Sequence, residues 1–179
     1  HLVFAEPGNA AARQLEADAL EQLGYQCENG TWRSLYLMGA FELRNGVVKG
    51  LNLNVATPDT IKAMSVPLYF DYMGIRLIGE KAASLGQSVL NWNFTDLHET
   101  YCVTVRNGAL TYRQGVQDPR ADATITLTKA TLDAISLEQT TFDKAIADGR
   151  ITISGDKSKL TQLLGMLDTF DLMFNIIEP

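Results

Sequence analysis

Apolar and polar residues alternate with a period of two through the second half of the chain, a pattern typical of half-buried β-strands. Leu90, Trp92 and Phe94 alternate with asparagines and a threonine, and the pattern recurs at 101–105, 110–112 and 123–127. A last short strand is expected around 151–153. Strands with one apolar face need a cover, so the pattern predicts a five-stranded antiparallel sheet covered by helices.

Turn and capping residues predict where these elements begin and end. Asn107-Gly108 is the preferred two-residue hairpin turn, because both positions need positive φ. Thr57-Pro58-Asp59 combines an N-cap hydroxyl, a proline suited to the first helical position and an early acid, and therefore predicts a helix start. Pro67 should kink or divide the helix that follows. Residues 80–87 are expected to form a loop.

Helical periodicity returns towards the C-terminal end. Thr128 can cap one helix, and a short helix is expected around Phe142. Gly155-Asp156 is expected to cap a long terminal helix. Beyond Phe170 the apolar residues point in several directions, which is more apolar surface than one sheet can cover. The stripe of that helix recurs at close to 3.6 residues and comprises Leu160, Leu163, Leu164, Leu167, Phe170 and Phe174.

The front of the chain, 1–46, contains only helical patterns. Asn9 is placed to cap a first helix, Gly24 is expected to end it, and a second helix should follow the turn at 29–31. Two helices with small residues at close-contact positions resemble one tetratricopeptide-type hairpin, which cannot bury its apolar face alone. We therefore predict an α+β chain with two parts, a helical hairpin at 1–46 and a sheet domain at 47–179. The short, mixed stretch 47–53 is expected to be a strand or the link between the two parts.

Composition and charge exclude some classes of binding partner. The chain has 179 residues, a net charge of −6 and no run of Lys or Arg, which argues against nucleic acid or an anionic membrane as a partner. No apolar run approaches the ~20 residues of a membrane span. Cys27 and Cys102 fit no zinc or redox spacing and are expected to be free, buried thiols. The chain begins at His1, and we expect it to carry no signal peptide and to be a fragment of a longer protein.

Two motifs in the second half resemble sterol-carrier-protein-like domains. Residues 121–127 read Ala-Asp-Ala-Thr-Ile-Thr-Leu, and residues 149–156 read Gly-Arg-Ile-Thr-Ile-Ser-Gly-Asp before the Leu-rich helix. The front part resembles the end of the dimerisation region of bacterial alkyl sulfatases, through Phe4-Ala5-Glu6-Pro7-Gly8-Asn9-Ala10 and the segments around 19–25 and 32–44. Those enzymes pair a metallo-β-lactamase-type zinc domain with a dimerisation domain and a carrier-like C-terminal domain.

The resemblance implies partners for this chain, and it also implies a catalytic zinc domain that this chain lacks. The zinc site of such sulfatases is a His-rich cluster, but His1 and His98 stand at no ligand spacing. The chain should therefore hydrolyse nothing by itself, with no cofactor here and the zinc in the absent catalytic domain. The implied partners are an aliphatic small molecule such as an alkyl sulfate or a fatty acid, the parent's own catalytic domain, and a second copy in a homodimer. The resemblance also implies a bacterial parent that is periplasmic or secreted.

The candidate ligand-binding residues are apolar side chains that could line a pocket for an aliphatic chain. For each of them, ordinary core packing is the competing interpretation, and for the end of the chain so is burial against the missing catalytic domain. Two rival functions stay open, a dimerisation and shielding scaffold, and the carrier-like C-terminal domain of another enzyme such as an acetyltransferase. His98 is expected to be a solvated turn residue. The candidates are Met64, Met73, Leu90, Trp92, Leu164, Leu167, Phe170, Met173 and Phe174.

Overall fold

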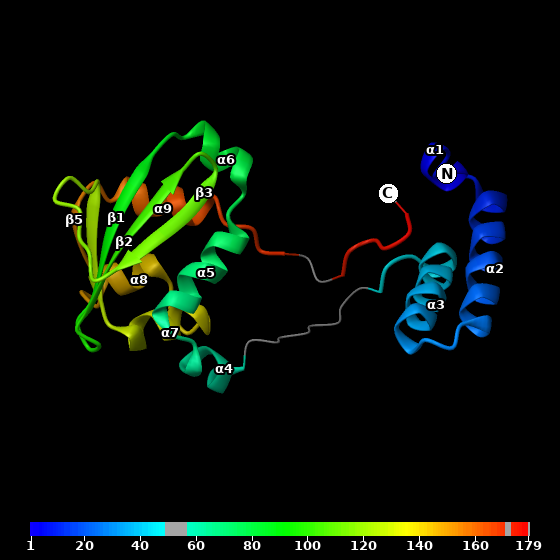
Figure 1. Ribbon diagram of the computed structural model, residues 1–179, viewed down its shortest axis with the longest axis horizontal. Helices are drawn as coiled ribbons and strands as arrows, with labels where there is room; N and C mark the ends of the chain where they lie inside the picture. Colours follow the sequence, from blue (N-terminus) through cyan, green and yellow to red (C-terminus); the bar gives the residue numbers. More distant parts are fainter. Residues whose placement is uncertain (49–56, 171–172, 179) are drawn as a thin grey trace. The chain divides into compact units, whose positions relative to one another are not determined.

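The chain forms two compact units (Figure 1). The computed structural model describes residues 1–48, 57–170 and 173–178. The helical unit comprises His1–Leu53 together with Asp171–Pro179, and the sheet unit comprises Asn54–Phe170. The chain therefore returns to the helical unit at its C-terminal end, which the sequence patterns did not indicate. Of the strand or link expected at 47–53, positions 47 and 48 lie outside any strand, and 49–53 fall outside the described residues.

The helical unit contains α1 (Leu2–Ala5), α2 (Ala10–Gln26) and α3 (Gly30–Asn45). The predicted cap is confirmed, because Asn9 Oδ1 accepts a hydrogen bond from Ala12 N at 3.0 Å. The predicted stop at Gly24 is wrong, since α2 continues to Gln26. Gly24 serves close packing instead: a Cβ at this position would lie 2.7 Å from Leu37 Cδ2 on α3. The glycine lets the two helices approach each other. The predicted helical hairpin is therefore confirmed, but Gly24 contributes to helix packing and does not end α2.

The sheet unit is built on β1 (Ser88–Phe94), β2 (Glu99–Arg106), β3 (Ala109–Gln114), β4 (Ala123–Leu127) and β5 (Thr152–Gly155). The strands lie in the order β3-β2-β1-β4-β5 (Figure 1). The α+β class is confirmed, and so is the hairpin turn, with φ of 52° at Asn107 and 75° at Gly108. The prediction of a wholly antiparallel sheet is wrong. Strands β1 and β4 are parallel, and the other pairs are antiparallel.

The parallel pair depends on the segment 115–122 between β3 and β4. Because β3 runs in the direction of β1, this segment must return to the start of β1 before β4 can pair alongside it. Asn91 fixes its path: its side chain donates to Asp118 O and accepts from Asp118 N, both at 2.9 Å. Asp122 N then donates to Val89 O at 2.8 Å. A period-two pattern does not predict these long-range hydrogen bonds, and it carries no information about strand direction.

The helices of the sheet unit are α4 (Pro58–Ala63), α5 (Val66–Arg76), α6 (Gly79–Ser84), α7 (Lys129–Ser136), α8 (Phe142–Ala147) and α9 (Ser158–Gly165). The helix starts expected at Thr57 and Thr128 are confirmed, because each side chain accepts a backbone N–H of the following turn. Pro67 lies in the first turn of α5, so the predicted division is also confirmed. The prediction of a loop at 80–87 is wrong in its first part, because α6 continues to Ser84. This helix has no side-chain cap that could have indicated its start.

The terminal helix is much shorter than predicted. Its N-cap is Lys157 rather than the predicted Gly155-Asp156, although Asp156 Oδ1 accepts Ser158 N at 2.9 Å. Helix α9 ends at Gly165, and the next residues pair with the end of α5 instead of continuing the helix. Ile78 N donates to Met166 O at 2.9 Å, Asp168 N donates to Arg76 O at 2.7 Å, and Leu77 forms a bridge with Leu167. Tertiary hydrogen bonds therefore override an apolar pattern that would suit a longer helix.

The core of the sheet unit lies between the apolar face of the sheet and α5 to α9. Phe70 of α5 is at its centre and fully buried. Its ring centroid lies 5.3 to 5.5 Å from those of Tyr101, Tyr112 and Trp92. Edge-on and tilted ring pairs at these separations stabilise a core beyond the area they bury.

Replacing this central ring should destabilise the sheet unit strongly. Phe70→Ala is expected to lower its free energy of unfolding by about 3–5 kcal/mol, because the cavity adds to the lost transfer energy. Tyr72→Ala, on the exposed side of the same helix, should cost well under half as much. Urea unfolding followed by the fluorescence of Trp92 measures both, in a Trp32→Phe background that removes the second tryptophan. Equal losses would contradict the central role of Phe70.

Candidate functional site

A cleft of about 370 Å³ opens in the sheet unit where α4 ends and α5 begins. The turn after β1, the start of β2, the end of β3 and the start of α7 complete its walls. The apolar lining residues are Ala63, Met64, Val66, Pro67 and Leu97. The polar ones are Lys62, Ser65, Glu99, Tyr101, Gln114 and Lys129.

The cleft exists because the chain breaks its helix at this point. Met64 ends α4, and Ser65 begins α5 by accepting Leu68 N on its hydroxyl at 3.3 Å. Pro67 has no backbone N–H, so it can occupy only the first turn of the new helix. The junction Met64-Ser65 is therefore extended, and the wall it forms is not closed by continuous helix.

Two lysines and one carboxylate line the cleft, and one of the lysines is paired with an aspartate outside the lining. Lys62 makes no ion pair among the described residues, whereas the Lys129 ammonium contacts Asp133 at 2.5 Å. The turn carrying Leu97 is tied to α7, since Asp96 Oδ1 accepts Lys129 N at 2.9 Å. With Glu99 also present, the cleft combines an apolar wall with two lysines and one carboxylate. Such a surface suits an amphiphile better than a fully polar ligand.

Tyr101 links this rim to the core. Its ring packs against Phe70, and its hydroxyl donates to Glu99 Oε2 at 2.5 Å. Burial raises the pKa of Tyr101 above its usual value, and the hydrogen bond to Glu99 raises that pKa further. The phenol therefore stays protonated and holds the Glu99 carboxylate in place.

Of the nine residues predicted to line a pocket, the structure brings five into one hydrophobic cluster, the core of the sheet unit. Met64 alone lines the cleft. Met73, Leu90 and Trp92 are fully buried in the core, so that a ligand between them would have to displace protein side chains. The remaining predicted residues of the sheet unit are Leu164 and Leu167, which pack partly buried against the core, and Phe170, which is 44% exposed.

Met173 and Phe174 belong to the helical unit rather than the sheet unit. Phe174 is 66% exposed. The pocket expected from all nine residues thus remains a prediction, and the cleft is a separate candidate. Sequence reasoning did not single out Lys62, Leu97 or Lys129. The available signal was indirect: two helix starts, at Thr57 and Ser65, imply an extended junction between them.

The other expectations about chemical groups can be compared with the described residues. His98 is exposed in the turn between β1 and β2, as predicted. Both cysteines are free, with Cys102 buried as expected and Cys27 only half-buried. Within the described ranges, no three His, Cys, Asp or Glu side chains gather in a way that could hold a metal ion. No described helix is long and apolar enough to cross a membrane.

Comparison with known proteins identifies the family. The family model described as "Alkyl sulfatase C-terminal" matches residues 54–179, more than half of the chain. The chain belongs to this family. A second model, "Alkyl sulfatase dimerisation", matches residues 1–46. The resemblance to alkyl sulfatases predicted from the front and second-half motifs is thereby confirmed.

Two curated alkylsulfatases match this segment over its whole length. A linear primary-alkylsulfatase from a Pseudomonas species is 50% identical over 179 residues, and an (R)-specific secondary-alkylsulfatase from a Pseudomonas species is 45% identical. The chain spans 26% of the length of each of these curated relatives. The solved inverting sec-alkylsulfatase Pisa1 from a Pseudomonas species matches all of this chain and 28% of its own, with 44% identity and a TM-score of 0.86.

The raised pKa of Tyr101 predicts a loss of stability at alkaline pH. Below the unfolded pKa of ~10 the phenol is neutral in both states. Above it the unfolded chain releases a proton that the folded chain keeps, so unfolding becomes more favourable as the pH rises towards the folded pKa. Tyr101→Phe should therefore lose less of its own stability between pH 9 and 11 than the unsubstituted chain does, as measured by urea unfolding. Tyr72→Phe is the control and should follow the unsubstituted chain.

Proposed function

We propose that the sheet unit binds the aliphatic part of an amphiphile, such as an alkyl sulfate or a fatty acid, in the cleft beside Met64. In this proposal it is a non-catalytic binding module of an alkyl sulfate hydrolase and recruits the tail of the substrate. The observation that carries the proposal is the cleft itself, an apolar wall with lysines at its rim.

The size and chemistry of the cleft support this assignment. Its volume of about 370 Å³ lies at the lower end of the ~300–1,000 Å³ range of small-molecule sites. Each methylene that leaves water for an apolar wall contributes ~0.8 kcal/mol, so a short stretch of alkyl chain is enough for measurable affinity. Met64 adds a flexible thioether side chain, which adapts to ligands of different shape.

Family membership favours the alkyl sulfatase context over the acetyltransferase alternative, since both family models and the relatives named above are alkyl sulfatases. The described residues offer no metal-ligand cluster, so the proposal assigns no hydrolytic step to this chain. It leaves zinc to the catalytic domain that the resemblance implies, and it makes that domain the partner that receives the bound substrate.

Binding can be tested on the 179-residue chain by titration with a fluorescent fatty-acid analogue and by calorimetry with alkyl sulfates below their micelle concentration. Saturable binding is expected, with affinity rising about fourfold per added methylene until the cleft is filled. Met64→Asp should weaken binding at least about fivefold, because it places a charge on the apolar wall.

Leu85→Asp is the matched control, since Leu85 is exposed on the sheet unit and does not line the cleft. It should bind like the unsubstituted chain. Absence of saturable binding would refute the carrier function, and equal weakening by both variants would place the binding surface outside this cleft.

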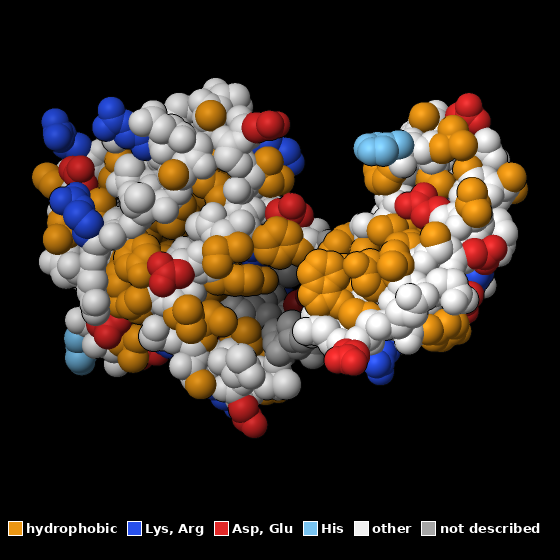
Figure 2. Space-filling view, turned by 45° about the vertical axis from the view of Figure 1, so that its right-hand side comes forward, with side chains coloured by type: hydrophobic (Ala, Val, Ile, Leu, Met, Phe, Trp, Pro, Cys, Tyr) orange, Lys and Arg blue, Asp and Glu red, His pale blue; other side chains and the backbone are white. Residues whose placement is uncertain are grey.

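We infer a second role for the helical unit, self-association into the homodimer of the parent. Apolar side chains reach the surface of this unit, which lies on the right of Figure 2. A packed α2–α3 pair does not require them to be apolar, and an exposed patch of this kind is typical of protein–protein contacts. Exposed large apolar residues of α2 and α3 are Leu15, Leu23, Tyr25, Trp32, Leu35, Met38 and Phe41.

A charge placed on this surface should shift the chain towards monomer. Leu35→Glu combined with Met38→Glu is expected to raise the dimer dissociation constant by at least about tenfold, because a buried unpaired charge costs more than 1.4 kcal/mol. Sedimentation velocity at several concentrations measures it. Circular dichroism confirms that the variant is folded, and Leu85→Glu on the sheet unit is the control. A chain that is monomeric at all concentrations without substitution would contradict this role.

A further inference from the structure

The last described residues of the chain lie on the α2–α3 hairpin. Ile177 packs against Gly39, where an added Cβ would lie 3.4 Å from Ile177 Cγ1 and 3.3 Å from Leu20 Cδ1. The side chain of Ile177 is partly buried there, against a small core that belongs to the helical unit. That core comprises Val3, Ala17, Ala40 and Leu43.

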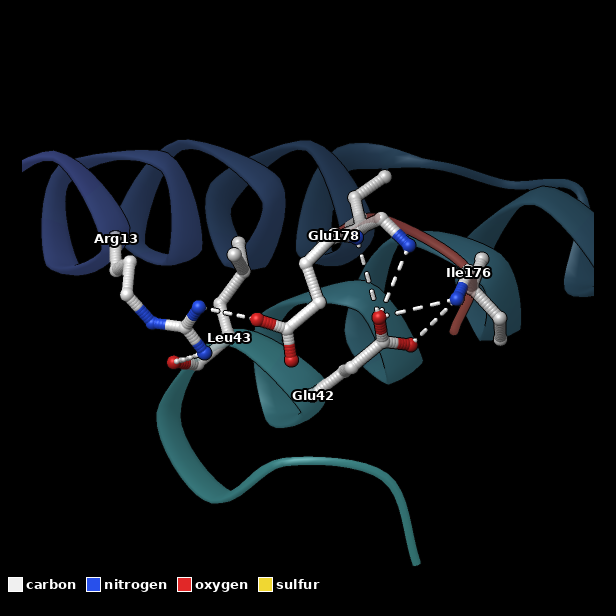
Figure 3. A network of polar contacts seen from close by, with 6 residues as sticks. Arg13, Glu42, Leu43, Ile176 and Glu178 are labelled. Carbon is white, nitrogen blue, oxygen red and sulfur yellow. Dashed lines mark hydrogen bonds and ion pairs between the residues drawn. The ribbon is translucent and has the colours of Figure 1, made fainter. Parts of the chain in front are cut away.

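A buried carboxylate faces the main chain of this segment. Glu42 of α3 is only 3% exposed. Its two oxygens accept Ile176 N at 3.0 and 2.8 Å, and Oε1 also accepts Ile177 N at 3.1 Å and Glu178 N at 3.3 Å (Figure 3). An ionised carboxylate is an acceptor only, so it matches three successive N–H donors. Hydrogen bonds to a charged acceptor are stronger than neutral ones.

Arg13 of α2 holds the end of the same segment. Its guanidinium pairs with the Glu178 carboxylate and also donates to Leu43 O at 3.0 Å (Figure 3). The hydrogen bond from Arg13 to Glu178 raises the pKa of Arg13. The tail is therefore bound at two points, its main chain by Glu42 and its last described side chain by Arg13.

We propose that Arg13, Glu42 and Gly39 form a binding site on the α2–α3 hairpin for the C-terminal segment 176–178 of this same chain, a C-terminal clasp. Glu42 recognises backbone N–H groups, and Gly39 leaves room for Ile177. Since the sheet unit runs from Asn54 to Phe170, the continuous chain joins it to the helical unit at its N-terminal end, and the clasp adds a second attachment at its C-terminal end. The inserted unit is thus doubly tethered to the dimerisation hairpin, independently of whether it binds a ligand.

Hydrogen exchange of the tail amides in the 179-residue chain tests the clasp, read by NMR or mass spectrometry. In the unsubstituted chain the amides of 176–178 should be protected. Glu42→Gln puts an amide donor beside three N–H donors and should speed their exchange at least about tenfold, the effect of losing a hydrogen bond to a charged group. Glu28→Gln removes an equal charge from an exposed position of the same unit and should leave the tail protected.

A second pair of variants changes only the tail. Ile176→Pro removes the N–H that contacts both Glu42 oxygens, whereas Ile176→Ala shortens the side chain and keeps that N–H. In the proline variant the amides of 177 and 178 should exchange rapidly, and in the alanine variant they should stay protected. The amides of α2 and α3 should exchange slowly in both variants. If Glu42→Gln also unfolds the hairpin, this pair decides the question. Unprotected tail amides in the unsubstituted chain, or equal exchange in the proline and alanine variants, would overturn the clasp.

Discussion

The sheet unit depends on one constraint, the need to cover a single apolar sheet face. Trp92, Tyr101 and Ile125 are neighbours across β2, β1 and β4 and all point to this face, where they are fully buried. The cover is supplied by helices before and after the strands, with Phe70 packed at the centre. Because burial of apolar surface is the dominant favourable term in folding, the connecting segments follow paths that keep this face covered.

The candidate site follows from an interruption in that cover. Met73, Leu90 and Trp92 are fully buried above the sheet, so a ligand placed among them would have to displace protein side chains. At the junction of α4 and α5 the helix breaks, and there the apolar wall reaches solvent. Aliphatic binding at the edge of the core costs no repacking, which favours the cleft over the interior as the place for a guest.

Local signals predicted the elements whose stabilising contacts are themselves local. The caps at Asn9, Thr57 and Thr128 and the Asn107-Gly108 turn act within a few residues, and they are where the sequence predicted them. The errors concern long-range partners. Strand β4 takes its direction from contacts near Asn91, and α9 ends where Met166 and Asp168 bond to the end of α5. No periodicity within a segment carries that information. The cleft was missed for the same reason, since its walls come from segments distant in sequence.

Glu42 shows what a hydrophobic pattern conceals. At its position in α3 a leucine or alanine would suit a buried site, and burying an unpaired carboxylate costs several kcal/mol. The cost is offset only where donors converge, and in the described part of the chain they come from 134 residues away and beyond. An apolar side chain could stabilise a tail nonspecifically, but it could not select three consecutive N–H groups and so fix the register of the segment. The Glu42 carboxylate is buried, and its donors all lie in one segment distant in the sequence. This arrangement therefore fixes which segment binds, and in which register, rather than giving the greatest possible stability.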